Sequence, residues 1–232
     1  MPEFEFELPL LPLPTVLFPN ARMPIDVKSR HEELMISQCL IDRTPFGAVL
    51  MHSDNVRELA ERQMVGTAAE IIHVERLPDD RLSLIARGHR RFRILEIVQE
   101  SPYIIARVQF PAIMLFLVSE LFHTANRVAA MFHRYLELAY TPRVRDRREF
   151  ILPMSPVDLA YAVGGALLIP SDEKQMLLEM FNPDRMLTAE VRILQREIER
   201  LQVDDFYRQE VQATASRSLV TMPPPRGVNE AN

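Results

Sequence analysis

The sequence contains no tryptophan, one cysteine and only six glycines among its 232 residues. The lone cysteine, Cys39, excludes an internal disulfide framework and fits a reducing compartment. The longest uninterrupted apolar run covers residues 112–118, far short of the roughly 20 residues that a membrane-spanning helix needs. Met1 leads into Pro2-Glu3 rather than into the basic segment and apolar run of a secretory signal. We therefore expect a soluble, cytoplasmic protein without a membrane partner.

Lysine is nearly absent, since Lys28 and Lys174 are the only lysines among the 27 basic residues. Arginine suits ion pairs and the recognition of carboxylates or phosphates, whereas Schiff-base chemistry needs lysine. A compositional bias of the genome is the alternative explanation for this excess of arginine over lysine. The formal net charge of −5 argues against a protein whose main task is to neutralise phosphates.

Familiar catalytic patterns are missing from the sequence. It has no phosphate-binding G-x-x-x-x-G-K-[ST] loop, no G-x-S-x-G and no H-E-x-x-H, and its six histidines form no i, i+4 pair. Ser171 and Lys174 fit the S-x-x-K pattern of serine acyl-enzymes, but the companion motifs are absent. Ser171 followed by two acidic residues is better interpreted as a helix N-cap. We expect no catalytic residue, metal or cofactor.

The first 111 residues predict a small, mostly β domain with one inserted helix. Prolines crowd the first 24 residues, and Ser29 with Glu32 predicts the start of the helix. Short apolar runs and alternating patterns predict the strands, which we place at 46–51, 65–77, 81–87, 91–98 and 103–110.

Residues 112–206 predict four helices. Apolar residues recur at spacings of four and three from Met114 to Ala139 and again from Leu187 to Leu201. Two shorter helices begin at Ser155-Pro156 and at Ser171. We expect close backbone packing or a local break of the helix at the Gly164-Gly165 pair, and a disordered tail over residues 207–232.

Two surfaces emerge as candidate binding sites. The first helix after Pro111 carries more apolar residues than one buried stripe requires, which favours either burial on two sides or a polypeptide-binding surface at Phe116, Leu117, Phe122 and Met131. The basic strand segment offers nucleic-acid contacts at Arg87, Arg90, Arg91 and Arg93. We prefer a plain strand there, with Phe92 and Ile94 inward and Arg91 and Arg93 outward.

Up to about residue 204, the chain resembles the N-terminal domain of Lon proteases, peptidase family S16. The resemblance lies in the order and spacing of Leu8-Pro9-Leu10-Leu11-Pro12-Leu13, Phe18-Pro19, Val65-Gly66-Thr67, Leu77-Pro78-Asp79, Arg91-Phe92-Arg93-Ile94, Asp172-Glu173-Lys174-Gln175 and Asn182-Pro183. Two departures are Asn20 and Asp80, which stand where the family often has glycine.

The resemblance implies an α+β fold in which a PUA-like, mostly antiparallel β-barrel with one inserted helix precedes a four-helix bundle. It also implies a non-catalytic substrate-recognition module, without the ATPase domain or the Ser-Lys protease domain of full-length Lon. The expected partner is unfolded or client polypeptide, or a protease or chaperone. RNA binding through the basic strand is the alternative, because PUA-like barrels also occur in RNA-binding proteins. The helix over residues 184–204 is a candidate contact between copies of the chain.

Overall fold

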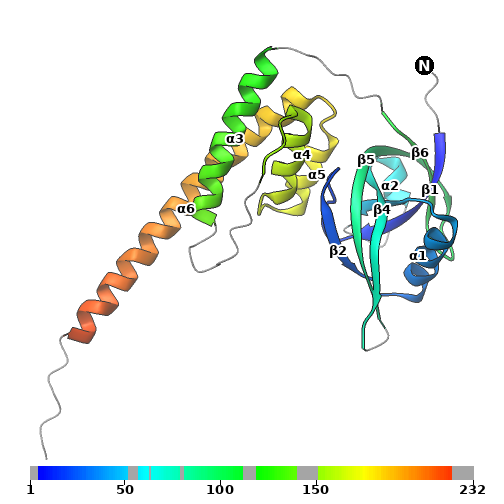
Figure 1. Ribbon diagram of the computed structural model, residues 1–232, viewed down its shortest axis with the longest axis horizontal. Coiled ribbons are helices and arrows are strands. Elements are labelled where there is room, and N and C mark those ends of the chain that lie inside the picture. The colour runs from blue at the N-terminus through cyan, green and yellow to red at the C-terminus, as the bar shows by residue number, and fades with distance from the viewer. Residues whose placement is uncertain are drawn as a thin grey trace, which may run out of the picture.

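The computed structural model describes residues 5–51, 57–62, 64–78, 81–111, 119–139 and 151–220. Figure 1 shows a β-rich half followed by a helical half. The β-rich half contains β1 (Glu5–Leu13), β2 (Arg22–Asp26), α1 (Arg30–Asp42), β3 (Phe46–Leu50), α2 (Arg57–Glu61), β4 (Val65–Arg76), β5 (Leu82–Gln99) and β6 (Ile105–Gln109). The helical half contains α3 (Ser119–Ala139), α4 (Pro156–Ala166), α5 (Ser171–Glu179) and α6 (Pro183–Val220). The predicted α+β class is confirmed. Among the described residues, no helix is both long enough and apolar enough to cross a membrane.

The six strands form one sheet in the order β2-β5-β4-β3-β1-β6. Strand β5 also pairs with β6, so the circuit of paired strands from β5 through β4, β3, β1 and β6 returns to β5. Every pairing is antiparallel except that of β1 with β3. The alternation predicted for 103–110 is present, because Ile104, Ala106 and Val108 are buried in the β-rich core.

Strand β5 is one continuous strand of 18 residues, whereas the sequence analysis expected a break at Gly88-His89. Gly88 is required by packing rather than by a turn, because a Cβ at this position would lie 2.4 Å from the carbonyl oxygen of Phe18. Gly88 therefore permits a close approach of the β1–β2 loop. In that loop Asn20 has a φ of 65°, a left-handed conformation that glycine and asparagine tolerate.

The predicted helix starts are confirmed at two positions and wrong at a third. The hydroxyls of Ser29 and Ser155 accept hydrogen bonds from the amides of Glu32 and Asp158. Ser171, in contrast, is the first residue of α5, and Pro170 occupies the N-cap position. The Ser171 hydroxyl donates instead to the carbonyl oxygen of Pro14 at 3.0 Å, so it joins the helical half to the loop after β1.

The predicted apolar stripes fill the core of the helical half. On α3 and α6 the buried stripe residues are Leu121, Ala125, Val128, Phe132, Tyr135, Leu187, Val191 and Leu194. The apolar stripe of α6 therefore packs against other helices of the same chain. Helix α6 continues to Val220, beyond the end that the sequence analysis expected, and runs past the end of α3 in Figure 1.

One of the hydrophobic clusters spans both halves. Val16 and Phe18 from the β1–β2 loop, with Leu50 and Val65 from the strands, belong to the same buried cluster as the helices. The Phe18 ring lies against the Gly164-Gly165 pair of α4, where a Cβ at Gly164 would approach Phe18 Cε1 to 2.9 Å. The close packing predicted at the glycine pair is therefore present, and its partner is an aromatic ring.

Candidate functional site

The structure shows one of the four predicted apolar site residues at the surface. Phe122 on α3 is 46% exposed. Met131, further along α3, is partly buried and packs against the helical core. Phe116 and Leu117 lie outside the described residues. Among the described members of this set, Phe122 is therefore the one whose side chain is accessible to a partner.

The four arginines of the basic strand have four different environments. Arg87 forms an ion pair with Glu70 at 2.7 Å. The guanidinium of Arg90 lies over the Phe110 ring and donates to the Pro111 carbonyl oxygen at 3.2 Å. Arg93 is partly buried beside Phe181. Phe92 and Ile94 point inward as expected, and both are fully buried.

Arg91 is buried against the helical half. Its side chain is 6% exposed, and its Nη1 donates to the carbonyl oxygens of Leu178 and Met180 at 2.9 and 2.7 Å. The guanidinium carbon lies 4.9 Å from the ring centre of Tyr161 and 4.6 Å from that of Phe181. Burial lowers the pKa of Arg91 from its ordinary value, and the adjacent Tyr161 partly offsets that effect. Arg91 therefore faces away from the β-rich core, as expected, but helices α4 and α5 cover it.

The residues of the S-x-x-K pattern bond to two different backbone carbonyls. Ser171 donates to Pro14, and the Lys174 Nζ donates to the Gly165 carbonyl oxygen at 3.0 Å. Burial lowers the pKa of Lys174. Both side chains therefore hold α5 in place. Within the described part of the chain, no group of three or more histidine, cysteine, aspartate or glutamate residues is arranged to hold a metal ion.

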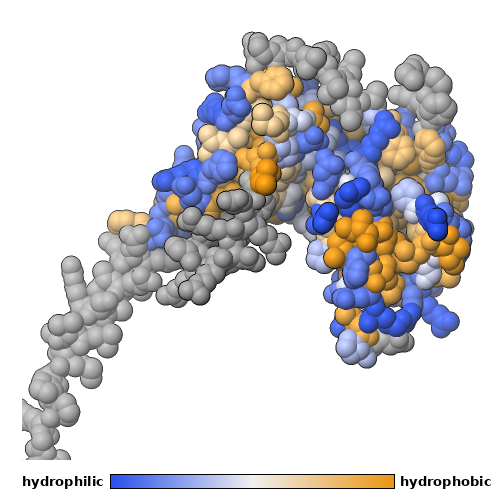
Figure 2. Space-filling model, viewed as in Figure 1, coloured by the Kyte–Doolittle hydropathy of each residue, from blue (hydrophilic) through white to orange (hydrophobic). Residues whose placement is uncertain are grey.

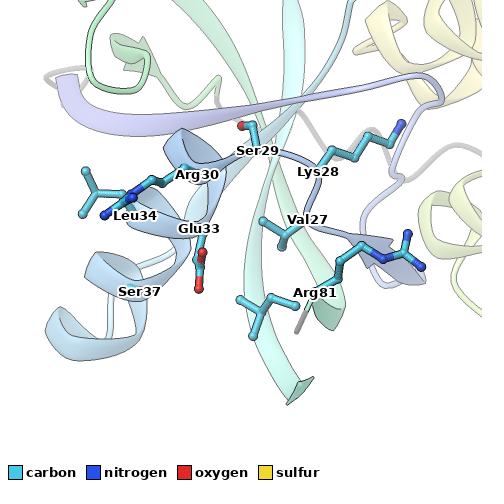
Figure 3. A pocket seen from close by; sticks show the side chains of 9 residues that line it. Val27, Lys28, Ser29, Arg30, Glu33, Leu34, Ser37 and Arg81 are labelled. Carbon is cyan, nitrogen blue, oxygen red and sulfur yellow. The ribbon is translucent and has the colours of Figure 1, made fainter. Parts of the chain in front are cut away.

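An open groove lies between α1 and the start of β5 (Figure 3). It encloses a volume of about 480 Å³. Three segments that are separate in the sequence meet there: the connection from β2 to α1, the first two turns of α1, and the start of β5. The lining residues are Val27, Lys28, Ser29, Arg30, Glu33, Leu34, Ser37, Arg81 and Leu82.

The groove has a mixed floor and a basic rim. Figure 3 shows Arg30 on one side and Lys28 and Arg81 on the other, with Glu33 and Val27 between them. Glu33 is the one carboxylate among the lining residues, and it is paired with Arg76 at 3.2 Å. Lys28, Arg30 and Arg81 are thus the basic residues of the rim, on a chain that is acidic as a whole.

Exposed aliphatic side chains continue the groove along α1. Leu34 is 48% exposed and Ile41, two helical turns further on, is 75% exposed. The opposite face of α1 is already filled, because Met35, Ile36 and Cys39 are buried in the core. Figure 2 shows hydrophobic residues at the surface of the β-rich half, over β4 and β5 and beside α1. A solvent-facing pair of large aliphatic residues is the feature expected of a contact surface.

The sequence analysis missed this groove. Apolar residues on both faces of the helix over residues 30–42 were a visible signal, since one face alone is enough to anchor a helix of this length. The contribution of Arg81 and Leu82 was hidden, because nothing local places residues 81–82 beside residues 27–37.

Comparison with known proteins gives relatives over most of the chain. Residues 7–196 match the family described as the ATP-dependent protease La (LON) substrate-binding domain. The Lon protease of Solibacter usitatus is 26% identical over 200 residues, which are 85% of this chain and 25% of that protein. The Lon protease of Syntrophus aciditrophicus is 25% identical over 219 residues, 91% of this chain and 28% of that protein. The chain thus spans about a quarter of the length of these relatives.

Solved structures with a similar fold include two Lon N-terminal domains. The Lon N-terminal domain protein of Xanthomonas campestris aligns with a TM-score of 0.59 at 22% identity, over 79% of this chain and 95% of that one. The N-terminal domain of the Mycobacterium avium complex Lon protease aligns with a TM-score of 0.65 at 17% identity, over 84% of this chain and 98% of that one. Because the family match covers most of the chain, and both halves of the fold lie within it, this chain belongs to the Lon substrate-binding domain family.

Proposed function

We propose that the chain is a non-catalytic module that binds extended polypeptide segments in the groove between α1 and the start of β5. The observation that carries the proposal is the pair of exposed aliphatic residues, Leu34 and Ile41, beside an open groove large enough for several side chains. The family to which the chain belongs is named for substrate binding, which supports the same role.

The groove suits an unfolded client for two physical reasons. An apolar client side chain placed on Leu34 and Ile41 gains roughly 25 cal/mol for each Å² of apolar surface removed from water. The cations of the rim attract clients that carry acidic residues, and such attraction accelerates encounter more than it strengthens the final complex. Apolar contact should therefore dominate the affinity.

Two finer features of the fold belong to the same proposal. The circuit of paired strands from β5 back to β5 supports a closed, PUA-like barrel in the β-rich half. The four helices that share a core in the helical half support a four-helix bundle. In this arrangement the barrel carries the groove, and the helical half holds the β1–β2 loop from the far side.

The alternative of RNA binding loses support from the placement of the arginines. Arg91 is buried and Arg87 is already paired with Glu70, so the basic strand offers no continuous row of cations to a phosphate backbone. We therefore favour polypeptide over RNA, and binding to RNA would have to weaken steeply with salt to support the alternative.

The test is a fluorescence-anisotropy titration of a labelled, permanently unfolded polypeptide at low and high salt. We expect saturable binding that persists in high salt and weakens at least tenfold, about 1.4 kcal/mol, in the double variant Leu34→Ser/Ile41→Ser. Phe122→Ser is the matched control, because it removes an exposed apolar residue of the helical half.

The two variants separate the competing sites. If Phe122→Ser abolishes binding while the α1 double variant binds normally, the binding surface lies on α3 and the groove is not the site. If the wild-type chain does not bind the polypeptide, the polypeptide-binding role itself is wrong. Circular dichroism spectra of both variants check that each is folded.

A further inference from the structure

A small notch lies where β5 meets helices α4 and α5. His89, Arg90 and Arg91 line it from the strand, and Tyr161 and Phe181 line it from the helical half, with Pro19 and Pro111 at its sides. Its volume is about 30 Å³. Since a water molecule needs about 10–15 Å³ of such space, the notch has room for a small polar group.

The buried cation in this notch lacks a counter-charge. Among the residues that the structure describes, Arg91 has two carbonyl oxygens and two aromatic rings as its neighbours but no carboxylate within ion-pair distance. Arginine is almost never buried without a partner of opposite charge, because removing its charge from water is costly. Two neutral carbonyls satisfy some of its donors but leave its charge unmatched.

Carboxylates on the neighbouring elements have other partners, and Glu179, between Leu178 and Met180, accepts a hydrogen bond from Gln175 at 2.8 Å. Glu70 binds both Arg87 and His89, at 2.7 and 2.9 Å. Asp158 accepts a hydrogen bond from the Asn20 side chain at 2.9 Å. None of the residues that line the notch is acidic. The local charge is therefore positive, at a place that the two halves of the molecule enclose together.

We propose that the notch binds one carboxylate group, which supplies the missing counter-charge of Arg91. A carboxylate is small and planar, and it matches the planar donor fork of a guanidinium better than a tetrahedral phosphate or sulfate does. Tyr161 lines the notch, and its hydroxyl, which is hydrogen-bonded with Arg91, is a further donor. Because both halves contribute to the notch, the bound carboxylate stabilises their junction. This inference is independent of the proposed polypeptide groove.

The experiment is urea unfolding of the full chain in increasing sodium formate, with sodium chloride and sodium phosphate at matched ionic strength. A ligand that binds only the folded state raises the ratio of folded to unfolded chain about 11-fold at ten times its dissociation constant. We expect a saturable rise with formate and a smaller, non-saturable response to the other two salts. Equal responses to all three salts would overturn the proposal.

Variants locate the formate effect. Arg91→Ala removes the cation, but its loss can unfold the chain, so Tyr161→Phe is the decisive variant because it removes only the hydroxyl. Tyr135→Phe is the matched control, since its buried hydroxyl bonds to the Leu168 amide elsewhere in the helical half. We expect the formate response to weaken at least threefold in Tyr161→Phe and to remain in Tyr135→Phe. Equal formate responses in the two variants would place the anion elsewhere and refute the site.

A further arm distinguishes the source of the carboxylate. A short peptide with a free C-terminal carboxylate is titrated against formate-loaded protein, beside the same peptide as its C-terminal amide. Displacement of formate by the acid alone supports a site that takes the terminal carboxylate of a polypeptide. Displacement by neither peptide supports a site for small free carboxylates. Equal displacement by both peptides contradicts carboxylate recognition.

Discussion

Arg91 is the residue whose removal should most disturb the junction between the β-rich half and the helices. Arg91→Ala deletes two hydrogen bonds from a charged donor, worth about 1.5–3 kcal/mol each, and leaves two buried carbonyl oxygens without that donor. It also removes the contacts with the rings of Tyr161 and Phe181, worth about 1–2 kcal/mol together. Against these losses stands the relief of no longer burying a cation, which is several kcal/mol.

The net expectation is a loss of about 2–4 kcal/mol in the free energy of unfolding, because the lost hydrogen bonds and ring contacts exceed the relief of desolvation by about that amount. Urea denaturation monitored by tyrosine fluorescence and by circular dichroism measures it. Arg91→Lys should recover little, because a single ammonium cannot reproduce the planar fork between two rings. Arg90→Ala at the exposed neighbouring position is the control, with an expected loss below about 1 kcal/mol. Equal effects of Arg91→Ala and Arg90→Ala would refute the reasoning.

Two further predictions concern the helical half. Gly164→Ala should lower the free energy of unfolding by about 1–3 kcal/mol, because the new Cβ would lie 2.9 Å from the Phe18 ring. Gly165→Ala should raise it by about 0.5–1 kcal/mol, because its Cβ would lie 3.7 Å from the same side chain, and differential scanning calorimetry of both variants measures the two effects. Burial raises the pKa of Glu190 well above 4.5, and the nearby Gly164 backbone offsets only part of that effect. Its contribution to stability is therefore complete below pH 4.5 and is lost as the pH rises through the folded-state pKa. Glu190→Gln should remove this pH dependence and be more stable than the wild type at pH 8, and a wild-type chain whose stability stays level from pH 4 to 8 would contradict it.

Local patterns in the sequence predicted most of the elements. Serine caps at Ser29 and Ser155 and the apolar stripe of α3 are local features, and the structure confirms them. The break expected at Gly88-His89 failed because the reason for that glycine is distant in sequence, namely the approach of the Phe18 carbonyl. A glycine pattern alone does not distinguish a turn from a close contact.

The candidate sites were harder to predict for the same reason. Strand alternation placed Arg91 on the outer face of the sheet, but only the tertiary fold brings α4 and α5 over that face. The groove beside α1 likewise joins residues 27–37 to residues 81–82. Periodicity indicates which face of a helix or strand is apolar, but it does not indicate which distant segment packs against that face.

The insertion of the β1–β2 loop into the helical core constrains the order in which the chain folds. Two hydrogen bonds that hold this loop join distant parts of the chain. Asn20 and Asp158 are 138 positions apart, and Pro14 and Ser171 are 157 positions apart. During synthesis at about 5–20 residues per second, the loop emerges about 7–30 s before the helix that covers Phe18. Through that interval the Val16 and Phe18 side chains lack their final neighbours, so the nascent β-rich half exposes the surface that α4 later buries. Folding of this chain should therefore finish late and be slow for its size, as contacts between distant residues generally make it.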